Sequence, residues 1–122
     1  MAEIQIRRIG DVMILPLNGK FGGQDQGGGE IIDSFVETIK RLVAEGNVKI
    51  VVDMEKVSLM NGSGLGALLF AMTSLKNTGR DLKLVKPSDK VKNFSDTVGV
   101  TTRFSIFNTV DDAVASFEKG HN

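Results

Sequence analysis

The stretch that decides the fold is Lys49–Leu75, KIVVDMEKVSLMNGSGLGALLFAMTSL. It begins with an apolar run, Ile50–Val52, which Asp53 closes. Burial on both faces, which such a run indicates, is typical of a central parallel strand. After a short link, apolar residues return at the spacing of one helical face, at Leu65, Leu68, Leu69, Met72 and Leu75. The stretch therefore predicts a buried strand, a turn that contains glycine, and a helix.

A hydroxyl group stands at the junction between this strand and this helix. The sequence Asn61-Gly62-Ser63-Gly64 interrupts the apolar pattern and places Ser63 at or next to the helix N-terminus. Backbone N–H groups there lack intrahelical partners and the helix dipole is positive, so an anion would be tolerated. On the residues alone, a plain N-cap role for Ser63 is the simplest interpretation.

The segment Asp53–Leu69 resembles the signature of the STAS-domain proteins, specifically of the bacterial anti-sigma factor antagonists. That motif reads roughly as an aspartate, a few residues, two apolar residues, Asp-Ser-Ser/Thr-Gly-Leu-Gly and a leucine-rich helix. Here the corresponding residues are Leu59-Met60-Asn61-Gly62-Ser63-Gly64-Leu65-Gly66-Ala67-Leu68-Leu69. The order of elements is similar over nearly all 122 residues.

The resemblance implies a non-catalytic binding module that needs no cofactor. Its unphosphorylated form would bind an anti-sigma factor, which is also a serine kinase, and so release a sigma factor. Ser63 matches the phosphorylated serine, and a phosphatase would reverse the modification. The implied partner-binding residues are Met60, Asn61, Gly62, Ser63, Gly64 and Leu65.

Three positions depart from the family pattern. Asn61 stands where the family usually has aspartate, which removes a negative charge beside the acceptor, and Gly62 stands where it often has serine. The family's acidic residue in the loop after the second strand would fall near Gly22, for which Asp25 is an approximate substitute. These departures bear on which kinase recognises the chain.

The length and composition of the chain fit one domain. Its 122 residues include 15 basic and 15 acidic ones, so no global field attracts nucleic acid or an anionic membrane. There is no cysteine, and Met1–Ile4 does not begin a signal peptide. Asp11, Asp53 and Glu55 have no spacing typical of a metal site. We expect a cytoplasmic monomer or weak dimer without direct contact to nucleic acid or membrane.

Strand and helix signals alternate along the rest of the chain. A hairpin turns at Gly10-Asp11, and the later elements are a helix over 32–43, a strand over 48–53, the motif helix, a strand over 82–85, a helix over 88–98, a strand over 104–107 and a helix over 109–117. The order β-β-α-β-α-β-α-β-α predicts a single α/β domain over residues 1–122, and this order is similar to the STAS architecture that the motif resemblance implies. Its sheet would be mostly parallel, with an antiparallel N-terminal hairpin strand and helices packed on it.

Two features interrupt the regular pattern. Pro16 cannot donate to a sheet ladder, so we expect the second strand to fray or bulge there. Residues 19–29 contain six glycines and one apolar side chain, so we expect a flexible loop that connects elements. The span Lys76–Lys92 holds six basic and two acidic residues, which is usual for a solvated face, with a surface that meets an acidic partner as the alternative.

Other functions account for parts of the same sequence. Gly62–Ala67 also fits a degenerate dinucleotide-binding pattern, but about seven residues separate it from the end of the preceding strand and no acidic residue ends the next one. A hydrolase with Ser63 as nucleophile lacks a base, because the only histidine, His121, lies near the C-terminus. A non-switching STAS subunit of a lipid-transport ATPase and a nucleotide- or small-ligand-binding domain stay open.

Overall fold

The computed structural model describes residues 4–22, 28–80, 82–97, 99 and 104–118. Its elements are β1 (Arg7–Ile9), β2 (Val12–Phe21), α1 (Gly28–Ala44), β3 (Ile50–Met60), α2 (Gly62–Lys76), β4 (Lys83–Val85), α3 (Asp89–Thr97), β5 (Ser105–Phe107) and α4 (Val110–Glu118). The five strands lie in the order β1-β2-β3-β4-β5, with β1 antiparallel to β2 and all other neighbours parallel. The expected single α/β domain, with a mostly parallel sheet and an antiparallel N-terminal strand, is confirmed.

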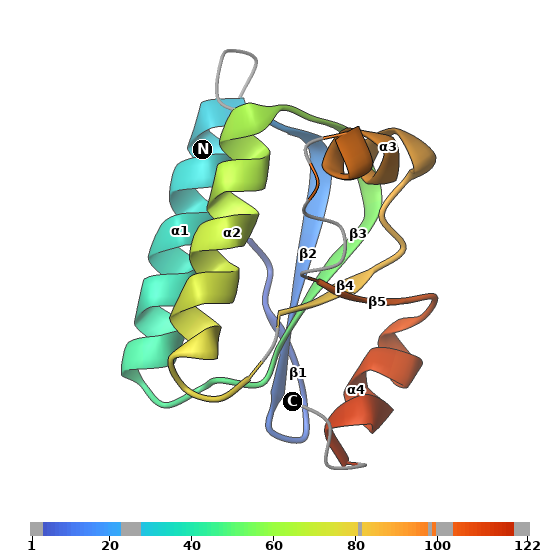
Figure 1. Ribbon diagram of the computed structural model, residues 1–122. Helices are drawn as coiled ribbons and strands as arrows, with labels where there is room; N and C mark the ends of the chain where they lie inside the picture. Colours follow the sequence, from blue (N-terminus) through green and yellow to red (C-terminus); the bar gives the residue numbers. More distant parts are fainter. Residues whose placement is uncertain (1–3, 23–27, 81, 98, 100–103, 119–122) are drawn as a thin grey trace.

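The sheet separates two hydrophobic clusters. Helices α1 and α2 lie side by side on one face, and α4 lies on the other (Figure 1). Alternate strand residues point to opposite faces, so Met13 and Leu15 join the cluster under α1 and α2, whereas Val12 and Ile14 join the cluster under α4. Parallel central strands are therefore buried on both faces, as the run Ile50–Val52 predicted.

The expected end of the central strand at Asp53 is wrong, because β3 continues to Met60. Two register shifts explain the error. Pro16 and Asn18 pair with Asp53 and Lys56, so that part of β3 carries one residue more than β2, and a second extra residue follows further along. Because each bulge disturbs the alternation, the inward residues of β3 fall three apart, at Met54, Val57 and Met60. A search for strict alternation misses such a strand.

The expected loop over residues 19–29 is also too long at both ends. Gly19, Lys20 and Phe21 complete β2, and Gly28 and Gly29 begin α1. Gly19 lies at the second register shift with φ of +74°, a left-handed conformation that glycine adopts without strain. The Phe21 ring is buried and meets Phe35 edge-on at 5.4 Å between ring centres. Residues 23–27, which include Asp25, lie outside the described part of the chain.

Lys83 departs from the solvated face expected for the basic span 76–92. It is only 1% exposed, and its ammonium lies 4.5 Å from the ring centre of Phe117 and 5.3 Å from that of Phe107. The two aromatic faces attract the cation, and the aliphatic stem packs between the sheet and α4. The other basic residues of this span are exposed or half-buried, at Lys76, Arg80, Lys86, Lys90 and Lys92.

Candidate functional site

The candidate site lies where β3 ends and α2 begins, with Asn61 as the only residue between them. Asn61 has an extended backbone and its side-chain Oδ1 accepts hydrogen bonds from the N–H groups of Ser63 (3.0 Å) and Gly64 (3.3 Å). Its carbonyl accepts the first helical bond, from the Leu65 N–H at 3.0 Å. Asn61, not Ser63, is therefore the N-cap of α2.

Ser63 is exposed at the second position of α2. The first turn of the helix contains no acidic residue, so the serine hydroxyl meets the positive end of the helix dipole without a neighbouring negative charge on α2. The backbone donors nearest to it are not free, since Asn61 already occupies two of them. A group added to the Ser63 oxygen would thus project into solvent beside a neutral amide.

Two glycines hold the end of β2 against this turn. A side chain at Gly64 would collide with the Phe21 carbonyl oxygen and approach the Met60 side chain to 2.8 Å. A side chain at Gly22 would lie 2.6 Å from Cγ and Nδ2 of Asn61. The absence of both side chains lets the carboxyl ends of β2 and β3 and the N-terminus of α2 meet in one tight junction.

The structure divides the six residues expected to bind a partner into two groups. Asn61, Gly62 and Ser63 are exposed, whereas Met60 is half-buried and Gly64 and Leu65 are buried. The exposed three can contact another protein, and the buried ones support the turn. His121 lies outside the described residues, as does Asp25.

Sequence reasoning missed two exposed apolar side chains on elements that form this junction. Leu59 on β3 is 45% exposed and Phe70 on α2 is 37% exposed. Phe70 could have been found, because it falls outside the Leu65, Leu68, Met72 spacing of the buried helical face. Leu59 could not, because its outward direction depends on the second register shift in β3.

The expected distance between Gly62 and the preceding strand, which counted against dinucleotide binding, is wrong. The strand before Gly62 does not end about seven residues away, because β3 reaches Met60 and leaves one intervening residue. The next strand still lacks the acidic residue of the dinucleotide-binding pattern, since β4 ends at Val85 and Lys86 follows it. Among the described residues, no three His, Cys, Asp or Glu side chains are grouped to hold a metal ion. Within the same residues, no helix has the length and apolar character to cross a membrane.

Comparisons with known proteins agree with this fold. The family model of the STAS domain matches residues 3–113, so the chain belongs to the STAS domain family. A crystal structure from Thermotoga maritima, described as a proposed anti-sigma factor antagonist, is 20% identical, covers 94% of each chain and superposes with a TM-score of 0.82. The search of curated proteins finds no match.

The anti-sigma factor antagonist SpoIIAA is similar in two states. Its unphosphorylated form is 17% identical over 96% of this chain and 98% of that one, with a TM-score of 0.72. The phosphorylated form, from Bacillus, is 19% identical over 93% of this chain and 98% of that one, also with a TM-score of 0.72. At such identities these structures establish the shared fold.

Proposed function

We propose that this protein is an anti-sigma factor antagonist whose binding is switched off by phosphorylation of Ser63. The observation that carries the proposal is the exposed Ser63 hydroxyl at the second position of α2, with no acidic residue in the first helical turn. Membership of the STAS family and the likeness to SpoIIAA, known in unphosphorylated and phosphorylated forms, support the choice of activity. The partner is an anti-sigma factor with serine kinase activity, and the exchange takes place in the cytoplasm.

The switch acts through charge. A phosphate adds about −1.5 to −2 charges at neutral pH. In the free protein this charge is solvated and lies at the positive end of the helix, so the fold is retained. In the complex the same charge must lose water against partner groups that fit a neutral hydroxyl. A mismatch of about 3 kcal/mol would lower affinity roughly a hundredfold, because each ~1.4 kcal/mol is a factor of ten.

The test begins with capture of partners from a lysate of the native cell, with and without phosphatase treatment. We expect the captured complex, given ATP, to add one phosphate to Ser63, as located by mass spectrometry. Ser63→Ala should abolish the modification, whereas Ser58→Ala, which changes another exposed serine at the end of β3, should leave it intact. A phosphate found elsewhere would refute the site.

The charge mechanism has its own test. Ser63→Asp should keep the circular dichroism spectrum of the wild type and lose the captured partner, as measured by calorimetry. Affinity equal to the wild type would contradict the mechanism. Stable co-purification with a transporter ATPase, without phosphate on Ser63, would replace the proposal with an accessory-subunit role. Thermal stabilisation by ATP or GTP alone would point to a nucleotide-binding domain.

A further inference from the structure

The outer face of α2 has a composition that the fold does not explain. α2 has 15 residues, and its only charged residue is the last one, Lys76. A surface helix normally carries charged side chains opposite its apolar face. In α2 the exposed positions before Lys76 are uncharged: Gly62, Ser63, Gly66, Phe70 and Thr73.

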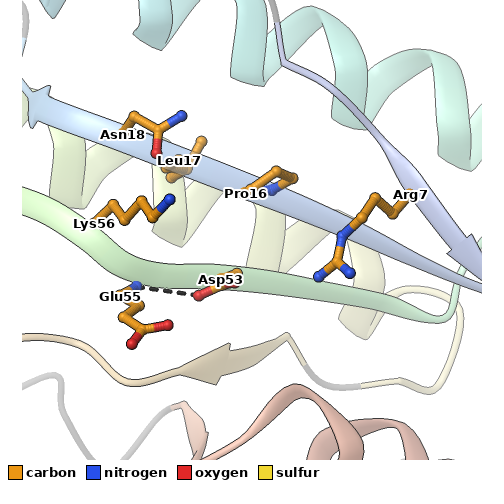
Figure 2. Close-up of a pocket in the computed structure, with 7 residues that line it drawn as sticks. All are labelled: Arg7, Pro16, Leu17, Asn18, Asp53, Glu55 and Lys56. Carbon is orange, nitrogen blue, oxygen red and sulfur yellow. Dashed lines mark hydrogen bonds between the residues drawn. The ribbon is translucent and has the colours of Figure 1, made fainter.

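Other exposed surfaces of the protein do carry charges. The described exposed positions of α1, which lies beside α2, are mostly charged: Asp33, Glu37, Lys40 and Arg41 (Figure 1). Charged side chains also surround a polar groove on the sheet face turned away from α2: Arg7, Asp53, Glu55 and Lys56 (Figure 2). The absence of charge is therefore particular to α2 and is not a property of the whole chain.

Phe70 is the large apolar side chain of this uncharged face, and it is 37% exposed. It follows Ser63 by seven residues, so the two side chains leave the helix within about 20° of one direction and about 10 Å apart along the axis. Gly66 lies between them, and nothing lies within 4 Å of a side chain added there. The surface between the ring and the hydroxyl is therefore open to another protein.

Any protein that brings an active site to Ser63 must cover this face. A standard interface buries about 800 Å² of each partner, which corresponds to a disc with a radius of roughly 16 Å. Phe70 falls inside such a disc centred on Ser63. The buried centre of an interface is depleted of charged residues and enriched in aromatic ones, which is the composition of this face.

We propose that Phe70 anchors the kinase that acts on Ser63, by inserting its ring into an apolar pocket of that partner. This inference rests on the proposed function and names the recognition site that it requires. The partner lies along the outer face of α2, surrounds the Phe70 ring and passes over Gly66 to reach the serine hydroxyl. Because the ring lies about two helical turns from the hydroxyl, it contributes to binding and not to phosphoryl transfer.

The test measures phosphorylation of this protein by the purified kinase that modifies Ser63 in the wild type. Phe70→Ala should raise the KM of the kinase for this protein at least about tenfold and change kcat less than about twofold. Ile9→Ala is the matched control, because Ile9 is 38% exposed and lies by the β1–β2 turn, at the opposite end of the sheet from the start of α2 (Figure 1). Its KM should stay within about twofold of the wild type.

A second pair of variants does not depend on removal of the Phe70 ring. Gly66→Lys adds a charge at an open position of the same face, so the variant should fold. Its KM should also rise at least about tenfold, because the ammonium would lose water at the centre of the interface. Ala44→Lys adds the same charge at the exposed end of α1 and should leave KM within about twofold. Circular dichroism and urea denaturation establish that each variant is folded.

The outcomes separate this inference from the proposed function. If the kinase phosphorylates Ser63 of the wild type and KM is unchanged for folded Phe70→Ala and Gly66→Lys, the anchor is overturned and the proposed function stands. If the wild type gains no phosphate on Ser63, the proposed function is overturned and the anchor with it. Self-association of the wild type that Phe70→Ala abolishes, measured by analytical ultracentrifugation, would assign the face to a second copy and overturn the anchor.

Discussion

The close contact between α2 and β2 predicts opposite effects for two substitutions on one helix. Gly66 is exposed on α2 and nothing lies within 4 Å of a side chain added there, so Gly66→Ala should gain the helix propensity of alanine, about 1 kcal/mol. Gly64 is buried, and an added methyl group would overlap the Phe21 carbonyl oxygen and crowd Met60. The same gain in propensity is then opposed by overpacking.

The overpacking term should win. Insertion of a methyl group into a packed site costs typically 1–3 kcal/mol, and more where the neighbour cannot rotate away. The Phe21 oxygen is a backbone atom of β2, so relief requires either the strand or the helix to move. We expect Gly64→Ala to lower the free energy of unfolding by about 2 kcal/mol or more after the gain in propensity is included.

Urea denaturation of the two variants and the wild type measures both effects. With a slope of roughly 1–3 kcal/mol per molar urea, the Gly64→Ala midpoint should fall by about 1 M and the Gly66→Ala midpoint should rise. Since both changes are the same methyl group on the same helix, propensity cancels in the comparison. A Gly64→Ala protein as stable as Gly66→Ala would refute the tight junction.

Three further predictions follow from single contacts. Asn61→Ala removes the N-cap of α2 and should cost about 1 kcal/mol of unfolding free energy, measured by urea denaturation. Lys83→Ala empties the space between the sheet and α4 and should lower the free energy of unfolding by about 2 kcal/mol or more. Lys90→Ala, at an exposed position of α3, should change it by no more than about 0.5 kcal/mol. The ammonium of Lys49 donates a 2.8 Å hydrogen bond to Asp11, and this bond lowers the pKa of the Asp11 carboxyl. The bond therefore stabilises the fold at pH values above the ordinary pKa of aspartate. This stabilisation is lost as the pH falls through the lowered pKa of Asp11. Asp11→Asn should therefore be less stable than the wild type at neutral pH and converge with it in acid, and a gap that stayed constant with pH would contradict this.

Most of the fold could be predicted from the sequence because its signals are local. The apolar run Ile50–Val52 and the helical spacing of the α2 leucines each identify an element without knowledge of its neighbours. The end of β3 could not be predicted, since the bulges that extend it arise from pairing with β2. The same is true of Lys83, because only the packing of α4 turns a lysine of a basic span into a buried one.

At the candidate site, too, the features set by neighbouring residues could be predicted and those set by distant segments could not. Glycines around Ser63 place it at the start of a helix, and the structure confirms that position. The sequence could not assign the cap to Asn61 in preference to Ser63, because both residues are suitable caps and they lie only two positions apart. The contact of Gly22 with Asn61 joins positions far apart in the chain and has no signal in either segment.

The tight packing of this junction bears on how a phosphate on Ser63 would act. Gly64 lies against the Phe21 backbone, so the start of α2 has no room to shift toward β2. Asn61 occupies the Ser63 and Gly64 donors, so the phosphate would have to displace a neutral cap to gain them. A phosphate could reach solvent without a shift of α2 and without loss of the Asn61 cap, so the added charge would stay at the surface and the backbone would stay in place. A partner would then sense the phosphate directly, and not through a change in the shape of the domain.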